Sequence, residues 1–330
     1  MSVAHVESSA PVELQLEQYR SELTAYSYRM LGSPFEAEDA VQETMIRAWR
    51  SIDRFEGRAA LRSWLYRIAT NVCLDMLKGR ERRARPMDLG PAQSSSSPPG
   101  PTLPEVAWLQ PIPDSSIVAT APDDPAELAL SRETIKLAFV AALQHLPARQ
   151  RAALILCEVL RWKASEAAEL LDTSVASINS ALQRARATIE SSEITVADAT
   201  PTVDPPQREL LDRYVKAFED YDMEALTSLI REDAIQSMPP FDLWLRGRDD
   251  ILDWWVGPGI ACQGSRVLPA PMANGSFAFG QYKPSESGSG HDPWALQVLE
   301  FDADGNIVEL TFFLDTERLF PLFGLPPRLD

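Results

Sequence analysis

The sequence predicts a multidomain chain in which two all-α domains are followed by an α+β domain. A chain of 330 residues exceeds what one hydrophobic core usually organises. A stretch dense in proline and serine at 86–125 and a second, proline-rich stretch at 200–207 interrupt it, and such stretches sustain neither a helix nor a sheet ladder. Helical periodicity precedes the second break, whereas short alternating segments such as "SFAFGQY" follow it. We therefore expect domains at 15–85, 126–195 and 205–330, with 86–125 as a linker.

The first domain is helical by pattern. The segment "LEQYRSELTAYSYRMLG" stops at Gly32, and the next helix begins with Ser33 as its N-cap, Pro34 in its first turn and Glu36 three residues after the cap. After the loop "DRFEGRAA", the segment "LRSWLYRIATNVCLDMLKGRERRAR" has apolar side chains at helical spacing and ends in a basic run. Residues 61–85 carry seven basic and two acidic side chains, a local charge of +5.

The second domain contains four predicted helices, and the last two form a helix-turn-helix pattern. Their apolar and small positions can close a shared core, with a tight turn at Asp172 and Thr173 and with Ser174 as the cap of the second helix. These core positions are Ala164, Ala168, Leu171, Val175, Ile178, Leu182 and Ala185. The side chains that face away are amides, hydroxyls and arginines, which can bond base edges or phosphates in a major groove. The alternative is a helical hairpin whose polar face is only solvated.

Charge is segregated along the chain. The formal total is −17, yet residues 196–330 alone hold ten basic and twenty-three acidic side chains, a balance of −13. Only the field within a Debye length, about 8–10 Å, decides whether a helix can approach phosphate. The acidic total therefore does not exclude DNA as a partner.

Several classes of protein and site are not supported by the sequence. No apolar run reaches the roughly 18 residues that span a bilayer, and the start "MSVAHVESSAPVELQ" lacks the features of a signal peptide, so we expect a cytoplasmic protein without a membrane partner. Cys73, Cys157 and Cys262 lie far apart, which predicts buried thiols rather than a disulfide or zinc site. The three histidines are equally scattered. We expect no metal and no cofactor.

The segment "EDAVQETMIRAWRSIDRFEGRAALRSWLYRIATNVCLDMLKGRERR" resembles region 2 of extracytoplasmic-function (ECF) sigma factors, and the helix-turn-helix resembles their region 4. The third domain, through its layout, "LWLRGRDDI" and "LFGLPPRLD", is similar to the SnoaL-like extension of some of these factors, a cone of helices against a curved sheet. The resemblance implies a non-enzymatic initiation factor. It would bind the largest-subunit clamp and the flap of core RNA polymerase and recognise the −10 and −35 promoter elements.

In the family, part of region 2 docks on the polymerase clamp. The matching residues here are Asp39, Gln42, Glu43, Arg47 and Trp49. An acidic and amide-bearing helix edge suits basic partner helices, with Trp49 as an aromatic anchor. The alternative is a solvated face balanced by Arg47, with Trp49 in the core. For Trp49 alone, we expect the core position.

The resemblance also assigns the promoter contacts. For the −10 element they are Phe55, Arg58, Arg62, Arg67, Ile68, Asn71, Arg80, Arg82 and Arg83. Extracting a base requires an apolar or stacking wall, an amide and nearby cations. Ile68 is equally compatible with the core, whereas Asn71 has no evident packing role. For the −35 element the contacts are Lys163, Ser174, Ser177, Asn179, Ser180, Gln183, Arg184 and Arg186. Where the family often has cations early in this helix, the chain has Asn179 and Ala181, which predicts weaker phosphate anchoring.

The third domain leaves several functions open. Some SnoaL-like relatives are enzymes with a buried acid or base, and the candidates here are Asp242, Asp253, His291 and Asp315. No spacing joins these four, so ordinary surface positions are favoured. Four tryptophans are expected either to line a pocket for an unidentified small ligand or to belong to the core: Trp244, Trp254, Trp255 and Trp294.

We expect the third domain to act as an intramolecular regulator. The apolar linker piece "VAWLQPIP" and the tail "FPLFGLPPRLD" would hold it against the DNA-binding domains. Two other functions remain for the chain as a whole: a SnoaL-like enzyme or ligand sensor recruited to DNA, and a one-component DNA-binding regulator that works without polymerase.

Overall fold

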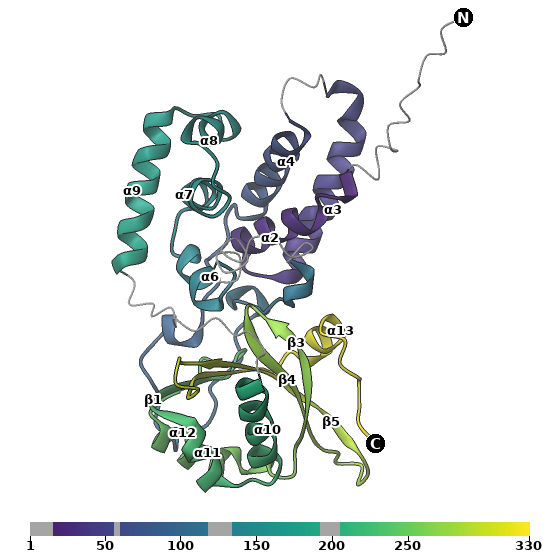
Figure 1. The fold of residues 1–330 in the computed structure, drawn as a ribbon, viewed down its shortest axis with the longest axis vertical. Helices are drawn as coiled ribbons and strands as arrows, with labels where there is room; N and C mark the ends of the chain where they lie inside the picture. The colour runs from purple at the N-terminus through teal and green to yellow at the C-terminus, as the bar shows by residue number, and fades with distance from the viewer. Residues whose placement is uncertain (1–15, 56–59, 118–133, 192–204) are drawn as a thin grey trace, which may run out of the picture. The chain divides into compact units, whose positions relative to one another are not determined.

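The computed structural model describes residues 16–55, 60–117, 134–191 and 205–330, which form two compact units (Figure 1). The first, the helical unit, comprises Met1–Arg80, Ser116–Ala121 and Leu146–Thr188. The second, the sheet unit, comprises Glu81–Ser115, Pro122–His145 and Ile189–Asp330. The compact units thus cut across the boundaries expected from the sequence. Most of the linker and the start of the expected second domain fold with the third domain.

The helical unit is a bundle whose helix ends follow the local sequence signals. Its elements are α2 (Arg20–Leu31), α3 (Pro34–Ser51), the 3-10 turn η1 (Ile52–Arg54), α4 (Leu61–Met76), α7 (Ala148–Leu154), the π-turn η5 (Ile155–Val159), α8 (Ala164–Leu170) and α9 (Val175–Ser191). Gly32 ends α2 with φ +72°, and the Ser33 hydroxyl accepts a hydrogen bond from the Glu36 amide at 3.4 Å. Both signals are confirmed.

One core joins α2, α4 and α7 within this unit. Tyr26 and Tyr66 are fully buried, and the Tyr26 hydroxyl bonds Thr70 Oγ1 at 2.7 Å. Arg151 of α7 is also buried, and its guanidinium donates to the carbonyl oxygens of Met30 and Leu146. Burial lowers the pKa of Arg151 to about 10. A guanidinium desolvated to this degree requires such carbonyl partners, so the contact of α7 with α2 is specific rather than incidental.

The sheet unit is an α+β body. Its helices and turns are η2 (Pro86–Asp88), η3 (Glu105–Ala107), η4 (Asp114–Ser116), α6 (Leu137–Gln144), α10 (Pro205–Glu219), α11 (Met223–Leu229), α12 (Arg248–Val256), η6 (Pro258–Cys262) and α13 (Thr316–Leu322). Its strands are β1 (Ile230–Ser237), β2 (Trp244–Arg246), β3 (Arg266–Ala273), β4 (Ser276–Pro284), β5 (His291–Phe301) and β6 (Ile307–Phe313). The sheet order is β2-β1-β6-β5-β4-β3, with β1 parallel to β6 and the other neighbours antiparallel.

The core of the sheet unit lies where α10, α11 and α12 pack beside the curved sheet (Figure 1). Tyr214 and Phe218 of α10 contact the aromatic rings of Phe279 and Trp255 respectively. A buried polar chain crosses this core. The Tyr214 hydroxyl donates to Gln297 at 2.9 Å, and the Gln297 amide donates to Gln281 at 3.0 Å. Each amide is therefore satisfied, as burial requires.

Two features bear on the classes of function. None of the described helices is long and apolar enough to cross a membrane. Within the described residues, no cluster of three or more His, Cys, Asp or Glu side chains could hold a metal ion. Cys73 is buried and its thiol pKa is raised to about 12 by burial, whereas Cys157 and Cys262 are only partly buried.

Candidate functional site

Helix α3 presents an exposed face that combines acid, amide and apolar side chains. Asp39, Gln42, Ile46 and Trp49 follow one another at helical spacing, and all four are exposed. Trp49 is 58% exposed, so the expectation that it belongs to the core is wrong. The buried face of α3 consists of small residues that end in Ala48, and one further residue along a helix turns the next side chain by about 100° to the outside. The sequence reasoning also missed Ile46.

The remaining members of the expected polymerase-binding set flank this face. The Glu43 carboxylate pairs with the Arg47 guanidinium at 2.6 Å, one helical turn apart. Arg47 also lies 4.0 Å from Asp75 of α4. All five expected residues therefore lie on one helix, and the exposed face formed by Asp39, Gln42, Ile46 and Trp49 is called the α3 face below.

The structure places the expected −10 reader on and beside α4. Asn71 is exposed, Ile68 is half-buried, and the ring of Phe55 lies 5.1 Å from that of Trp64. An amide next to a partly exposed apolar wall has the chemistry that holds an unstacked base. Arg58 lies outside the described residues.

Two arginines of α4 already have partners within the helical unit. Arg62 pairs with Glu22 at 2.9 Å and lies over the rings of Tyr66 and Trp162 at 5.3 and 5.9 Å. Arg67 donates to the Glu169 carbonyl oxygen at 3.2 Å and lies 3.5 Å from the carboxylate of the same residue. The cations expected to hold phosphate beside the −10 element are thus in contact with the segment that carries the helix-turn-helix.

The basic run after α4 divides into different environments. Arg80 is exposed and pairs with Glu36, and Arg82 is exposed and contacts the His145 ring. Arg83 differs because it is only 5% exposed. Its guanidinium donates to the carbonyl oxygens of Glu105 at 2.9 Å and Trp108 at 2.6 Å. The structure therefore places Arg83 inside the sheet unit, where it anchors the linker, and away from a phosphate-binding surface.

The helix-turn-helix has the geometry expected from the sequence at its turn. Asp172 adopts a left-handed conformation with φ +50°, and the Ser174 hydroxyl accepts a hydrogen bond from the Ser177 amide at 3.1 Å. In Figure 1, α9 lies at the edge of the helical unit beside α7 and α8. Ile178 is buried as expected. Val175 is 44% exposed, contrary to its expected core position, because it lies in the first turn of α9, ahead of the buried crossing.

The outward face of this motif carries the expected −35 contacts. The exposed ones are Lys163, Ser174, Ser177, Asn179, Gln183, Arg184 and Arg186, and Ser180 is half-buried. Arg184 donates to the Ser180 hydroxyl at 2.5 Å, and Arg186 pairs with Glu158. The amides and hydroxyls remain exposed, whereas both arginines are held close to the protein surface.

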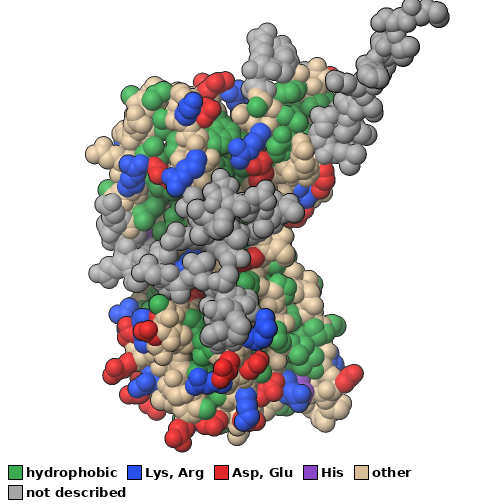
Figure 2. All heavy atoms as spheres, in the orientation of Figure 1, with side chains coloured by type: hydrophobic (Ala, Val, Ile, Leu, Met, Phe, Trp, Pro, Cys, Tyr) green, Lys and Arg blue, Asp and Glu red, His purple; other side chains and the backbone are tan. Residues whose placement is uncertain are grey.

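The four expected acid-base candidates of the third domain have unrelated surroundings. Asp253 is exposed on α12, and His291 Nε2 lies 3.2 Å from the Gly264 carbonyl oxygen. The Asp242 backbone carbonyl accepts from the Gln93 side chain at 3.3 Å. Asp315 is half-buried next to α13, and burial raises its pKa. Carboxylates of the sheet unit are spread over the face shown in Figure 2 rather than gathered in one patch.

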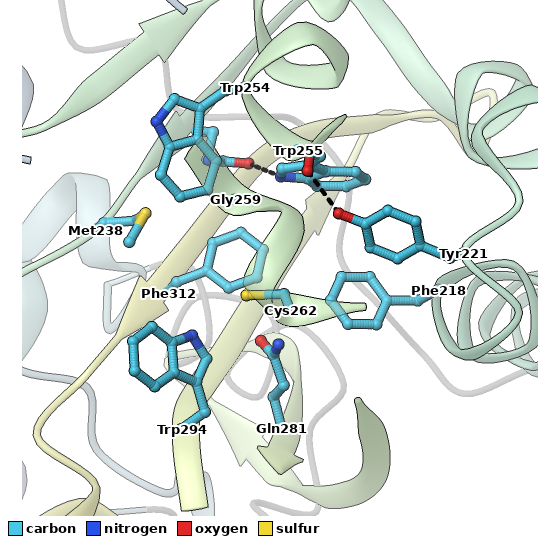
Figure 3. Close-up of a pocket in the computed structure, with 11 residues that line it drawn as sticks. Phe218, Tyr221, Met238, Trp254, Trp255, Gly259, Cys262, Gln281, Trp294 and Phe312 are labelled. Carbon is cyan, nitrogen blue, oxygen red and sulfur yellow. Dashed lines mark hydrogen bonds between the residues drawn. The ribbon is translucent and has the colours of Figure 1, made fainter. Parts of the chain in front are cut away.

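An aromatic cavity lies inside the sheet unit (Figure 3). It is lined by three of the four expected tryptophans, Trp254, Trp255 and Trp294. Trp244 does not line it, because its indole N–H donates to the Gly90 carbonyl oxygen of the linker at 2.9 Å. A second cavity of about 570 Å³ shares the Trp294 wall and is bounded on one side by the linker.

The linker is bonded to the sheet unit along most of its described length. Thr102 forms an antiparallel bridge with Phe241, and the Leu103 amide donates to the Pro240 carbonyl oxygen at 2.9 Å. Further along, Ile112 exchanges hydrogen bonds with Asn274 in the turn between β3 and β4. The same Asn274 side chain donates to the Ile135 carbonyl oxygen at 2.6 Å, just before α6. The apolar linker piece "VAWLQPIP" therefore packs on the sheet unit.

The C-terminal tail packs on the sheet of its own unit. Leu329 and His291 exchange backbone hydrogen bonds of 2.8 and 3.0 Å, and the Tyr282 hydroxyl donates to the Pro326 carbonyl oxygen at 2.9 Å. Leu325 lies directly over Gly280, where an added Cβ would meet its side chain at 2.8 Å. The tail therefore completes the sheet unit.

Comparisons with known proteins agree with this architecture. Residues 16–83 match the Sigma-70 region 2 model, 136–189 the Sigma-70 region 4 model and 211–310 the SnoaL-like domain model. The chain is 44% identical over 317 residues to the ECF RNA polymerase sigma factor SigG of Mycobacterium tuberculosis, covering 95% of this chain and 83% of that one.

Two further similarities cover different parts of the chain. It is 30% identical over 153 residues to the ECF RNA polymerase sigma-E factor of Escherichia coli K12, covering 46% of this chain and 71% of that one. The crystal structure of the extracytoplasmic function sigma factor SigJ of Mycobacterium tuberculosis has a similar fold, with a TM-score of 0.58 at 20% identity. That match covers 96% of this chain and 100% of the other.

Proposed function

The chain belongs to the ECF RNA polymerase sigma factors, which direct transcription initiation, and we propose that α3 binds core polymerase, α4 reads the −10 element and α9 reads the −35 element. We propose further that the third domain regulates these contacts by holding the linker. The position of the linker in the sequence supports this role, because the linker joins the segment that carries α4 to the segment that carries α9.

The α3 face is the proposed contact with the clamp of the largest polymerase subunit. An exposed tryptophan next to Ile46 supplies buried area on binding, and Asp39 supplies charge complementary to a basic partner. A large apolar side chain that is 58% exposed lowers the solubility of the free chain. An interface that buries this side chain removes that disadvantage. The polymerase flap is the second expected contact of the chain, on region 4.

The free chain holds its −10 reader in a closed arrangement. Arg67 contacts Glu169, and the ring of Tyr66 packs on that of Trp162 with centroids 5.2 Å apart. Glu169 and Trp162 both belong to the segment that carries the helix-turn-helix. Promoter phosphate and Glu169 therefore compete for the guanidinium group of Arg67. Promoter recognition therefore requires α4 and α8 to separate.

The observation that carries the regulatory role is the bonding of the linker to the sheet unit. Leu103 bonds Pro240, and Asn274 bonds Ile112, while Arg83 closes the linker on itself at Glu105 and Trp108. While these bonds persist, the linker cannot extend between two promoter elements. Release of the linker is thus the proposed step that frees regions 2 and 4 to spread over polymerase and DNA.

Run-off transcription with purified core polymerase on genomic promoter fragments tests this proposal. The full chain is compared with a chain that lacks residues 205–330 and with the full-length Asn274→Ala variant, which removes the side-chain bonds to Ile112 and Ile135. Both are expected to initiate more strongly than the wild type. Asn306→Ala is the matched control, because Asn306 lies in the β5–β6 turn and bonds Asp302 there. Unchanged activity and unchanged promoter affinity in both variants would reject the regulatory role.

A ligand-sensing role is the second candidate function, and the aromatic cavity favours it. Tyr221 and Cys262 are the ionisable residues among those that line the cavity, and burial raises the pKa of both. Neither group is thereby tuned to exchange protons near neutral pH, which favours binding over acid-base chemistry. Turnover of any bound molecule by the full chain would favour the enzyme alternative instead.

A further inference from the structure

Two glutamates lie side by side on the face of the sheet that the linker covers. Glu300 of β5 and Glu309 of β6 are partners in the antiparallel ladder, so their side chains leave the sheet on the same face. Their neighbours Leu299 and Leu310 belong to the core on the other face, with α10, α11 and α12. Like charges directly opposite each other destabilise a sheet, so this pair requires compensation from another segment.

A cation from either side of the linker in the sequence meets this pair. Arg85 Nη1 lies 4.0 Å from Glu309 Oε2, and only 14% of the Arg85 side chain is exposed. The linker residue Leu109 lines the same narrow pocket as Arg85 and Glu309. Lys136, directly before α6, is 6% exposed, and its positive charge acts on Glu300 together with that of Arg85. The linker and the segment before α6 therefore enclose the two carboxylates.

The same two segments are bonded to the turn between β3 and β4. The Asn274 amide donates to the Ile112 carbonyl oxygen of the linker at 3.1 Å, and the Asn274 side chain donates to the Ile135 carbonyl oxygen at 2.6 Å. Ile135 directly precedes Lys136 in the sequence. The Asn274 amide therefore reports whether these segments are on the sheet or have left it.

Burial sets the affinity of this pair for a proton. It raises the pKa of Glu300 to about 7, with a further increase from Glu309 and an opposing effect of Lys136 and Arg85. Because burial is the largest of these causes, exposure of the pair to water lowers the pKa of Glu300 towards its ordinary value of 4.5. At a pH between these two values, the linker-bound chain holds a proton that the released chain has lost.

We propose that the Glu300–Glu309 pair couples release of the linker to loss of a proton, so that acidification holds the linker on the third domain and alkalinisation releases it. This rests on the proposed regulatory role of the linker. A raised pKa in the bound state stabilises that state below the pKa of the released state, and the stabilisation is lost as the pH rises through about 7. Exchange of one proton changes the ratio of bound to released chain about tenfold between pH 6 and pH 8.

His145 titrates in the same pH range with the opposite sign. Its Nε2 lies 3.8 Å from Asp88 Oδ1 and 3.2 Å from Arg82 Nη1. Asp88 also accepts a hydrogen bond from the Arg85 amide at 2.8 Å, so His145 belongs to the same cluster of charges. Burial and then Arg82 lower the pKa of His145, so acidification favours release through this group. The His145→Gln chain removes this contribution and isolates Glu300.

Hydrogen exchange of the Asn274 amide between pH 6 and pH 8 tests the coupling in the full chain. The protection factor compares the observed rate with that of an unstructured amide at the same pH, which removes the intrinsic effect of pH on exchange. In His145→Gln, protection is expected to fall about tenfold from pH 6 to pH 8. Addition of Glu300→Gln is expected to keep the pH 6 value throughout, because glutamine has the shape of the protonated acid and does not titrate. Equal pH dependence of the two chains, or none in the first, would overturn the coupling.

Two further variants, made in the same His145→Gln chain, test the assignment to the pair. Glu286→Gln removes a carboxylate from an exposed position in the β4–β5 turn and is expected to leave the tenfold change intact. Glu309→Gln removes the like charge next to Glu300, so the pH at which protection falls is expected to decrease. An unchanged midpoint in Glu309→Gln, or loss of the pH dependence in Glu286→Gln, would contradict this assignment.

Transcription separates failure of this proposal from failure of the proposed function. Run-off initiation by His145→Gln, divided by initiation by the chain that also carries Glu300→Gln, cancels the effect of pH on polymerase itself. This ratio is expected to be about ten at pH 8 and about one at pH 6. The expected exchange with a ratio of one at both pH values would contradict the regulatory role and not the proton coupling. Exchange without the pH dependence would overturn the coupling and leave the regulatory role standing.

Discussion

Arg83 gives opposite predictions under two assignments, and the structure decides between them. The family resemblance assigns Arg83 to promoter phosphate, whereas the structure shows it buried and bonded to the Glu105 and Trp108 carbonyl oxygens at 2.9 and 2.6 Å. Arg83→Met keeps an apolar stem of similar reach and removes both bonds. If Arg83 contacts promoter phosphate, this variant initiates transcription more weakly than the wild type. If Arg83 anchors the linker, the variant initiates transcription more strongly.

The magnitude follows from the two bonds. Hydrogen bonds from a charged donor contribute about 1.5–3 kcal/mol each, and the pair is not fully additive, so the loss is about 2–4 kcal/mol. This corresponds to a roughly 30- to 1,000-fold larger population in which Arg83 and the part of the linker around Glu105 and Trp108 have separated. The Leu109 and Ala84 amides, which donate to the Ala84 and Ala107 carbonyl oxygens at 3.1 and 2.8 Å, report that population.

The assay combines hydrogen exchange of these amides with run-off transcription by the reconstituted holoenzyme. Arg83→Met is expected to exchange faster at both amides and to initiate more strongly. Arg82→Met is the matched comparison, because Arg82 is exposed next to it in the basic run. Arg82→Met is expected to weaken binding to every promoter sequence. It is also expected to lower the salt dependence of the binding constant by the amount that corresponds to about one phosphate contact. Slower initiation by Arg83→Met with unchanged linker exchange would refute the reasoning.

Three further predictions address the other surfaces. Trp49→Ala is expected to weaken core polymerase binding by about 2 kcal/mol or more in an affinity titration while leaving the Tm unchanged, since the side chain is 58% exposed; a lowered Tm would indicate a core role. Asn71→Ala is expected to cost about 1–3 kcal/mol in binding the cognate −10 element, and an equal loss on every sequence would contradict base reading. Burial next to Glu309 raises the pKa of Glu300 to about 7. The folded state therefore holds a proton that the unfolded state releases above about pH 4.5, so the free energy of unfolding falls by up to about 1.4 kcal/mol per pH unit from there to about pH 7. Urea titrations of wild type and Glu300→Gln isolate this slope, and identical slopes would show that Glu300 does not cause it.

Local signals predicted the helical parts of the fold well. Gly32, Ser33 and Ser174 act within one or two turns of the backbone, so their roles at helix ends can be read from the sequence alone. The same holds for Asp172, whose short polar side chain tolerates the left-handed turn of the helix-turn-helix. The segment "DADGN", rich in the short polar and glycine residues that favour turns, joins β5 and β6, with Gly305 at φ +83°.

The misplaced residues depend on contacts between segments far apart in the sequence. Trp49 is exposed because small residues complete the buried face of α3 without it. Trp244 bonds Gly90, which is 154 residues away, and Arg83 is buried only because the linker folds back over it. A basic run gives no sign of which cation a distant carbonyl will bind. Composition likewise marked the linker as a break but not where its apolar residues would pack.

The central claim is that the linker is held on the third domain in the free chain and released in the active holoenzyme. Hydrogen exchange of Leu103, Leu109 and Asn274, compared between the free chain and the chain bound to core polymerase and promoter DNA, tests it most directly. The Leu103 and Asn274 amides are bonded between the linker and the sheet, and the Leu109 amide is bonded within the folded linker. All three are expected to be protected from exchange in the free chain and to lose that protection in the promoter complex. Full protection retained in a transcriptionally active complex would contradict the account.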